Sequence, residues 1–131
     1  MTMTDPIADM LTRIRNANMV SKVYVDIPFS NFKVKILDVL KEEKYIKNYE
    51  IIEDKSRKYI RVYLLYFGKN KAITEIKRIS TPGRRIYVSK DKIPIIKNNY
   101  GIAVLTTSKG VMSSRKAKEI GIGGELLFYI W

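Results

Sequence analysis

The stretch Gly101–Glu125 reads GIAVLTTSKGVMSSRKAKEIGIGGE and holds the strongest structural signals of the chain. Its first six residues, which end at Thr106, are mostly apolar and predict a buried strand. Ser113 and Gly121 enclose a basic segment, which indicates a short helix with a serine cap at its start and a glycine cap at its end. A closing strand is predicted over Gly124–Trp131. We therefore expect strand, loop, helix and strand in this order.

The loop between strand and helix has an unusual composition, because three hydroxyl residues in a row lead into Lys and Gly. Small hydroxyls both donate and accept hydrogen bonds. They can bond 2′-hydroxyls, phosphate oxygens and base edges, while a glycine lets a partner approach the backbone closely. A helix cap accounts for the serine at the end of the loop but not for the hydroxyl run. The candidate nucleic-acid contacts of this loop are Thr106, Thr107, Ser108, Lys109 and Gly110.

The charge of the 131-residue chain is strongly positive and unevenly distributed. The formal net charge is +12, and residues 1–66 contain 12 basic and 9 acidic residues against 13 and 4 in residues 67–131. Such an excess indicates a polyanionic partner, with nucleic acid the first choice and an anionic membrane surface the second. No apolar run approaches the roughly 20 residues of a membrane span. The first ten residues lack a signal-peptide pattern, so we expect the protein to act where it is made.

Catalysis, cofactors and metal ions are not expected. The chain has no Cys and no His, which excludes disulfides, thiol nucleophiles, imidazole bases and the usual zinc sites. Asp5 and Asp9 lie one helical turn apart and could share a divalent ion, as in a metal-dependent nuclease. No third carboxylate is placed beside them by the sequence, and no phosphate-cradling loop follows a strand.

The N-terminal part of the chain predicts the order α-β-α-β-β. Asp5 is a good helix cap with Pro6 in the first helical position. The polar face of this first helix is either a solvated surface or a grip for phosphates. Ser30 is a plausible N-terminal cap for a second helix. The predicted elements are helices over Asp5–Asn18 and Ser30 to about Lys44, and strands over Tyr24–Pro28, Ile46–Glu53 and Lys58–Tyr66.

The C-terminal part predicts mostly strands. Phe67–Lys71 is polar with a glycine and is the best linker candidate. Ala72–Ile79 is predicted as a strand, although its isoleucine spacing also fits a helix. A turn at Pro82-Gly83 leads to a strand over Arg84–Ser89, and Lys90–Lys97 is expected to be irregular or a single turn. The fold class is therefore α/β (α+β) in two lobes, with an α/β lobe over residues 1–66 and an RNA-binding lobe, mostly antiparallel β with a short helix, over residues 67–131.

Two strand positions add to the candidate site. On the closing strand, strict alternation puts Glu125 on one face with Leu127, Tyr129 and Trp131. Its carboxylate either lies in solvent at the strand end or orients a cation and accepts from a base amino group. Tyr87 offers a hydroxyl and a stacking plane, or else packs in the core. Arg84 and Arg85 precede it and should point to opposite faces of their strand.

Three blocks in the same order resemble one family, the small-subunit ribosomal protein number eight of the bacterial or organellar type. They are DPIADMLTRIRNA at residues 5–17, STPGRRIY at residues 80–87 and TTSKGVMSSRKAKEIGIGGE at residues 106–125. The resemblance covers nearly the whole chain. The family usually has Ser where this chain has Thr106. It commonly has a glycine near Lys44, so the second helix should stop differently or Lys44 should adopt a left-handed conformation.

This resemblance implies a structural constituent of the small ribosomal subunit that binds a stem in the central domain of small-subunit ribosomal RNA and supports its assembly. Further implied partners are the protein's own operon messenger RNA and neighbouring ribosomal proteins such as numbers five and twelve, with no membrane. The implied location is the ribosome in the cytoplasm, or in the matrix or stroma of an organelle. The RNA contacts implied outside the loop are Tyr87, Glu125, Arg84, Arg85, Thr4, Arg13, Arg15, Asn16, Ser30 and Lys33.

The alternatives are a free translational regulator that binds a messenger RNA hairpin, and a generic nucleic-acid-binding protein. A DNA-binding protein would normally carry a groove-reading element such as a helix-turn-helix or zinc finger, and the sequence contains none that we recognise.

Overall fold

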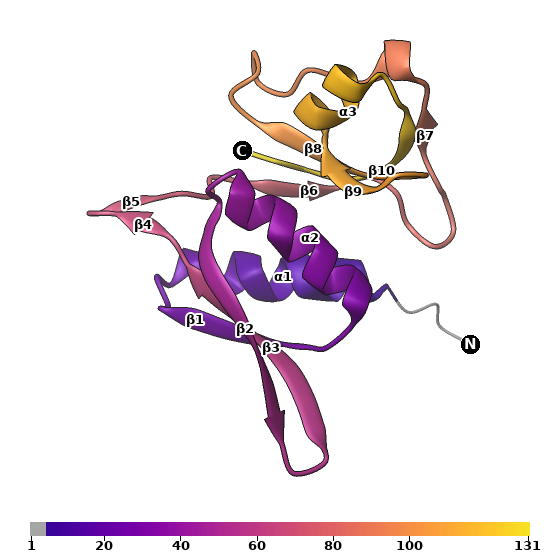
Figure 1. Ribbon diagram of the computed structural model, residues 1–131. Coiled ribbons are helices and arrows are strands. Elements are labelled where there is room, and N and C mark those ends of the chain that lie inside the picture. Colours follow the sequence, from indigo (N-terminus) through magenta and orange to yellow (C-terminus); the bar gives the residue numbers. More distant parts are fainter. Residues whose placement is uncertain (1–4) are drawn as a thin grey trace. The chain divides into compact units, whose positions relative to one another are not determined.

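The computed structural model describes residues 5–131, and their contacts divide the chain into two compact units (Figure 1). The first unit is Pro6–Thr74, and the second contains Asp5 and Glu75–Trp131. Both units combine helix with antiparallel sheet, so the predicted α+β class in two lobes is confirmed.

The first unit consists of two helices and a three-stranded antiparallel sheet. Helix α1 (Pro6–Met19) packs on strand β1 (Tyr24–Pro28), and helix α2 (Asn31–Glu42) packs on strand β2 (Ile46–Asp54). Strand β3 (Arg57–Leu64) lies between them, which gives the order β1-β3-β2. The predicted order α-β-α-β-β is confirmed, and β1 has the predicted bounds.

The core of this unit is built from helices and a strand that bury residues at different spacings. The helices bury residues three or four positions apart, and β3 buries every second residue. Full burial of one such aliphatic side chain contributes roughly 1.5–3 kcal/mol. The fully buried large residues of the first unit are Met10, Leu11, Ile14, Ile27, Ile36, Leu37, Leu40, Ile46 and Ile60.

Helix α2 is capped at both ends by its own sequence. At the start, the Ser30 hydroxyl accepts a hydrogen bond from the Lys33 amide at 3.1 Å, as predicted. At the end, Lys44 has a φ of +63°, and the Tyr45 amide reaches back to the Leu40 carbonyl at 2.8 Å. Lys44 therefore takes the left-handed position that glycine usually occupies, which costs about 1–2 kcal/mol for a residue with a side chain.

The segment Phe67–Lys71, predicted as a linker, is instead part of a small hairpin. Strand β4 (Tyr66–Phe67) pairs with β5 (Asn70–Lys71), and Gly68 has a φ of +64° in the turn. The linker prediction is wrong because a short polar segment with one glycine suits a tight turn as well as a flexible connection. The boundary between the two compact units lies between Thr74 and Glu75 in the sequence.

The second unit is built around one long strand. Strand β10 (Gly124–Ile130) pairs antiparallel with β8 (Ile102–Thr107), β6 (Ile76–Arg78) and β7 (Tyr87–Val88). Strand β9 (Gly110–Ser113) pairs with β8 at the edge of the sheet. Residues far apart in the sequence are therefore brought together on β10.

Helix α3 (Ser114–Ile120) has the predicted caps. The Ser113 hydroxyl accepts from the Lys116 amide at 3.2 Å, and Gly121 ends the helix with a φ of +81°. A short 3-10 turn over Lys90–Lys92 agrees with the predicted single-turn segment. The core under α3 consists of Ile93, Ile96, Ala103, Leu105, Met112, Ala117 and Leu126.

Three predicted segments of the second unit differ from the structure. Only Ile76–Arg78 of the predicted strand Ala72–Ile79 is strand, and only Tyr87–Val88 of Arg84–Ser89. The latter is shorter because Arg84 bonds back across the turn to Thr81 rather than to a neighbouring strand. The predicted loop after Thr106 is mostly a hairpin, since β8 continues through Thr107 and β9 begins at Gly110.

The predicted faces of the closing strand are also wrong beyond its first residues. The pairing of β10 with β8 shifts register between Leu126 and Phe128. A bulge adds one residue and so exchanges the two faces of a strand. Leu126 consequently packs in the same cluster as Tyr129 and Trp131, whereas strict alternation had placed it opposite them.

Candidate nucleic-acid interface

Three predicted site residues form one row across the sheet of the second unit. Tyr87 on β7 pairs with Glu125 on β10, and Glu125 pairs with Thr106 on β8. Residues directly opposite each other in a ladder point to the same face. The sheet therefore brings together three side chains from distant parts of the chain. Tyr87 is 68% exposed, so packing in the core is not its role.

Two glycines let the three strands of this row come close. A Cβ on Gly123 would lie 2.2 Å from the Val88 carbonyl oxygen, and a Cβ on Gly124 would lie 2.3 Å from the Thr106 carbonyl oxygen. Any side chain at either position would collide with backbone. Both positions therefore require glycine for close backbone packing, Gly123 against the end of β7 and Gly124 against β8.

The turn of the β8–β9 hairpin is braced by one threonine. The Thr107 hydroxyl donates to the Gly110 carbonyl at 2.8 Å and accepts from the Lys109 amide at 3.1 Å. Gly110 has a φ of +112°, where residues with a Cβ are strained, and nothing lies within 4 Å of a Cβ built on it. Its backbone conformation, rather than crowding, therefore accounts for the glycine.

The other two hydroxyls of the predicted run are available to a partner. Neither the Thr106 nor the Ser108 hydroxyl makes a hydrogen bond within the part of the chain that the structure describes, residues 5–131. Ser108 is exposed at the tip of the turn and Thr106 is half-buried in the row. Of the three adjacent hydroxyls, one therefore builds the turn, and the other two form no hydrogen bond with the described part of the chain.

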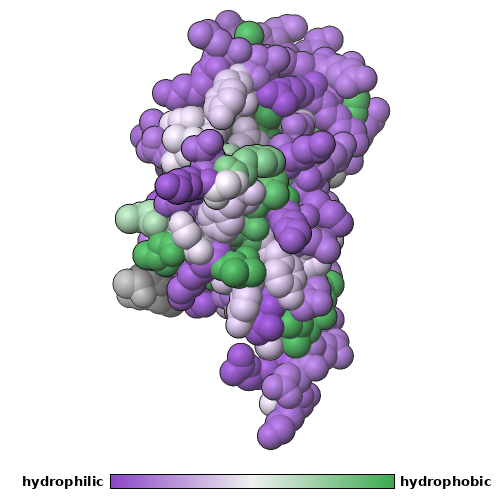
Figure 2. Space-filling view, turned by 90° about the vertical axis from the view of Figure 1, so that its left-hand side faces the viewer, coloured by the Kyte–Doolittle hydropathy of each residue, from purple (hydrophilic) through white to green (hydrophobic). Residues whose placement is uncertain are grey.

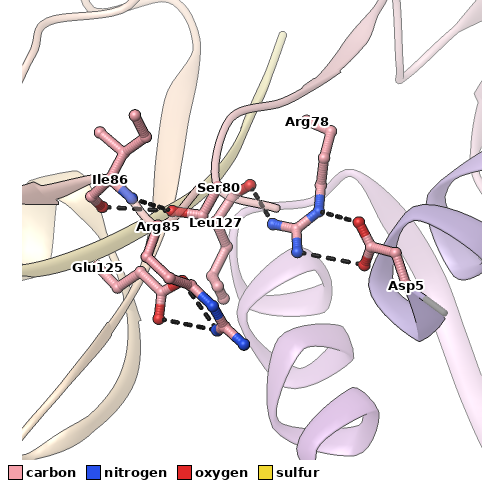
Figure 3. Close-up of polar contacts among 7 residues, drawn as sticks. All are labelled: Asp5, Arg78, Ser80, Arg85, Ile86, Glu125 and Leu127. Atoms are coloured by element: carbon pink, nitrogen blue, oxygen red, sulfur yellow. Dashed lines mark hydrogen bonds and ion pairs between the residues drawn. The ribbon is translucent and has the colours of Figure 1, made fainter. Parts of the chain in front are cut away.

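Glu125 is buried and neutralised by an arginine. Its side chain is 9% exposed, and its carboxylate accepts from the Arg85 guanidinium at 3.1 Å (Figure 3). A buried carboxylate is costly unless it is paired and hydrogen-bonded, so Glu125 holds Arg85 at the row. The Arg85 side chain remains 53% exposed. The expectation that Glu125 orients a cation is confirmed, and a solvated strand end is excluded.

The turn that carries the two arginines is closed by Ser80, which the sequence analysis did not select. The buried Ser80 hydroxyl accepts from the Ile86 amide at 2.9 Å and donates to the Ile86 carbonyl at 3.3 Å (Figure 3). Thr81 and Arg84 exchange backbone hydrogen bonds inside it. Neither arginine lies in a strand, so the predicted alternation of faces does not apply, and both are exposed. The only available signal was a serine placed just before Pro82-Gly83.

Asp5 is attached to the second unit by a second arginine that the sequence analysis missed. Arg78 donates to both oxygens of the Asp5 carboxylate, at 3.2 and 3.3 Å, and to the Leu127 carbonyl (Figure 3). A bidentate ion pair of this kind fixes the relative orientation of the two side chains as well as their distance. Thr4, a predicted RNA contact, lies outside the described residues.

The remaining predicted contacts belong to the first unit. Arg13 donates to the Asp9 carboxylate at 2.9 Å and to the Asp26 carbonyl at 3.4 Å. Arg15 is half-buried, and Asn16 is exposed on the same helix. The polar face of α1 is thus partly occupied by bonds within the protein.

Ser30 and Lys33 serve the fold. Ser30 caps α2, and the Lys33 ammonium is buried and donates to the Pro28 carbonyl at 3.2 Å. Burial lowers the pKa of Lys33 from its ordinary value, with Asp9 raising it by a smaller amount and Arg13 lowering it further. A lysine held in this way has little freedom to reach a phosphate.

The carboxylates considered for a metal ion are engaged elsewhere. Asp9 is paired with Arg13 and Asp5 with Arg78. Within residues 5–131, Asp and Glu side chains form no group of three that could hold a metal ion. Among the described helices, none is long and apolar enough to cross a bilayer.

Comparison with known proteins agrees with the three sequence blocks. Residues 5–131 match the family model described as Ribosomal protein S8. The chain is 56% identical over its full length to the small ribosomal subunit protein uS8 of Geobacter sulfurreducens, and 53% identical to that of Dictyoglomus turgidum, in both cases over all of the relative. It is 55% identical to the protein of the same name from Thermotoga maritima, with 98% of each chain covered. The chain therefore belongs to the ribosomal protein S8 family.

Proposed function

We propose that this protein is a structural component of the small ribosomal subunit that binds a stem in the central domain of the small-subunit ribosomal RNA and supports its assembly. The observation that carries the proposal is the family match over residues 5–131, together with full-length relatives named as small-subunit proteins. Membership of this family assigns a structural rather than a catalytic role.

The proposed RNA-binding surface is the row on the second unit with the adjoining hairpin turn. Thr106 and Ser108 supply hydroxyls that are not bonded within the described residues, and Tyr87 supplies an exposed ring and hydroxyl. Short hydroxyls reading 2′-hydroxyls and an aromatic ring stacking on a base are contacts that suit RNA. Thr107 and Gly110 act by holding the turn, as the hydrogen bonds of Thr107 support.

The proposed role of Glu125 is to position Arg85, whose guanidinium donates to both Glu125 oxygens at 3.4 and 3.1 Å, and to accept from a base amino group with a remaining lone pair of that carboxylate. Arg84, Arg85 and Lys109 supply charge beside the hydroxyls, and all three are exposed. The contacts of this group with phosphates give affinity and salt dependence, whereas the hydroxyls and Tyr87 give selectivity.

A second part of the proposal concerns the first unit and the start of the chain. Arg13, Arg15 and Asn16 lie on α1, and their proposed role is to contact the phosphate backbone. Ser30 and Lys33 shape the turn before α2, which supports a positioning role for them rather than direct contact. Thr4 is proposed as a contact on the family resemblance alone.

Finer partners are part of the same proposal. Neighbouring small-subunit proteins, such as numbers five and twelve, and a hairpin in the protein's own operon messenger RNA would be bound in addition to ribosomal RNA. A messenger hairpin that mimics the ribosomal stem would use the same row and turn. The proposed location is the ribosome, in a bacterial cytoplasm or in an organelle with its own ribosomes.

The test is equilibrium binding of the purified protein to a central-domain stem and to a fully base-paired RNA of equal length, over a salt series. We expect selective binding that persists in moderate salt. Replacing the two outward hydroxyls, Thr106→Val with Ser108→Ala, should weaken stem binding on the order of tenfold, since each hydroxyl hydrogen bond contributes about 0.5–1.5 kcal/mol. Ser56→Ala, in the turn of another hairpin, is the control.

Equal and salt-sensitive binding to both RNAs would contradict the proposal, because it would leave a polycation without a specific site. Cleavage of either RNA that depends on Asp5 and Asp9 would favour the nuclease alternative instead.

A further inference from the structure

The first unit exposes an apolar patch that the proposed RNA contacts do not use. Met19, Val20, Val23 and Phe67 each leave 60–71% of their surface exposed, and Tyr24 adds 42%. Figure 2, which faces the side of Figure 1 where β4 and β5 lie, shows hydrophobic atoms gathered near its middle among hydrophilic ones. Single exposed apolar residues are ordinary, but several large ones gathered together mark an interaction surface.

The backbone under this patch is held firmly in place. The loop after α1 is tied to the β4–β5 hairpin, because the Lys71 ammonium donates to the Met19 carbonyl at 2.9 Å and the Tyr66 hydroxyl donates to the Lys22 carbonyl at 2.7 Å. The Leu64 amide also donates to the Val23 carbonyl at 3.0 Å. The exposed side chains are thus displayed by a braced structure, which lowers the ordering cost of binding.

The loop itself adopts a strained conformation. Ser21 has a φ of +57°, and the Lys22 amide reaches back to the Ala17 carbonyl at 3.0 Å. A glycine would occupy this helix-end position without strain. The turn presents Val20 and Val23 to solvent on either side of it, so the strained backbone maintains the exposed patch.

A hollow adjoins the patch. It is open to solvent, has a volume of about 430 Å³, and is lined by Val23, Lys47, Tyr63, Leu64, Leu65 and Tyr66. Its walls are mainly apolar, with one lysine. A hollow of this kind accepts an apolar side chain that projects from a partner, which is how interfaces anchor their central residues.

The charges around the patch are mostly positive, and the Glu50 carboxylate beside the hollow accepts a hydrogen bond from the Tyr63 hydroxyl at 2.8 Å. Lys22, Lys47, Lys69 and Lys71 belong to the patch, and residues 19–24 and 63–71 contain no Asp or Glu. The aliphatic side chains of Met19 and the two valines neither stack on bases nor bond phosphates, which disfavours RNA as the occupant. An apolar centre with a charged rim is typical of protein interfaces.

We infer that this patch docks a neighbouring protein, one that inserts an apolar side chain into the hollow and surrounds it with carboxylates that meet the lysines. The inference rests on the proposed function, since the neighbour would be another protein of the same subunit. It adds a second interaction surface, on the first unit, to the RNA-binding row on the second.

The experiment uses assembled small subunits that contain Val23→Cys. Because the chain has no cysteine, this variant carries a single thiol. Ile51→Cys on β2 is the control, since Ile51 is a 46% exposed aliphatic residue outside the patch. Each free protein and each purified subunit is treated with a maleimide that carries a benzophenone, irradiated, and its cross-linked products are identified by mass spectrometry.

We expect both thiols to react in the free proteins. In the subunit, Val23→Cys should lose most of its labelling, and the fraction that is still labelled should cross-link to a protein segment that contains Asp or Glu. Adding Lys47→Glu and Lys69→Glu should reduce that cross-link. A cross-link to ribosomal RNA, or a thiol as reactive in the subunit as in the free protein, would overturn the inference. Co-sedimentation of the variant with small subunits is scored separately and tests the proposed function.

Discussion

The two long hairpins of this protein close through the same pair of residue types. The β2–β3 hairpin turns at Lys55-Ser56, and the β8–β9 hairpin turns at Ser108-Lys109. Each turn presents one hydroxyl and one ammonium to solvent. Judged by the composition of the turn alone, the two would be equally good RNA contacts.

Their surroundings separate them. The first turn is flanked by Glu53 and Asp54, and Glu53 pairs with Lys58 at 3.4 Å, so its charges largely cancel. The second turn is braced by Thr107 and adjoins a row of side chains contributed by two other strands. A candidate site is therefore defined by what the sheet places beside a turn, more than by the residues of the turn.

The backbones also differ in strain. Lys55 has a φ of +57°, whereas the positive φ of the second hairpin falls on Gly110. The first hairpin thus carries a strained lysine, and the second places a glycine where the conformation requires one.

The largest expected effect comes from a substitution that disrupts the row of side chains beside the second hairpin. In Gly124→Ala the new Cβ would lie 2.3 Å from the Thr106 carbonyl oxygen, so β8 and β10 must separate. We expect the free energy of unfolding to fall by about 2–3 kcal/mol, as for other overpacked positions. Urea unfolding measures this change. An unaltered midpoint would mean that β10 does not hold β8 as closely as described.

The next prediction concerns the residue with a positive φ in each hairpin, where one substitution adds backbone strain and the other removes it. Gly110→Ala should lower the free energy of unfolding by about 1–2 kcal/mol, and Lys55→Gly should raise it by up to about 1 kcal/mol, because the same left-handed penalty is added in one and removed in the other. Thermal unfolding of both variants tests this. Shifts of the same sign would contradict the comparison.

A smaller effect tests the hydroxyls. Ser108→Ala should weaken binding to the central-domain stem about threefold, the loss of one hydrogen bond of about 0.7 kcal/mol, while Ser56→Ala leaves binding unchanged. Both serines are exposed, so neither variant should alter stability. Filter binding at fixed salt measures the difference. Equal losses would show that the turns are not distinguished by their surroundings.

The smallest effect concerns charge. Lys109→Ala should reduce the slope of log K against log salt concentration by about one, as expected for a lost phosphate contact, and Lys55→Ala should not. The comparison requires affinities for the stem at several salt concentrations. A reduced slope for Lys55→Ala would place the RNA on the first hairpin as well.

Local chemistry was predictable where one residue dictates the backbone. Ser30 and Ser113 cap helices because a hydroxyl satisfies an amide left free at a helix start, and Lys44 is left-handed because a helix must end even without glycine. The strand over Tyr24–Pro28 was predicted with the bounds that β1 has in the structure.

Most of the failures fall where partners come from elsewhere in the chain. The bulge after Leu126 depends on how β10 pairs with β8, and it exchanges the faces that alternation predicts. The linker prediction for Phe67–Lys71 fails for a local reason, because a short polar segment with one glycine also suits a tight turn. The role of Glu125 depends on Arg85, forty residues away. A turn or cap is decided by a few consecutive residues, whereas a bulge or an ion pair depends on which strands lie side by side.

Composition, the absence of Cys and His, and three collinear blocks were enough to assign the class of partner and the family, since these are properties of residue types and their order. Only the tertiary structure decided which of Thr106, Thr107 and Ser108 is hydrogen-bonded within the turn. The same holds for the pairing of Glu125 with Arg85 and for the apolar patch beside β4 and β5. Each of these depends on distances between segments far apart in sequence, and those distances exist only once the sheets have formed.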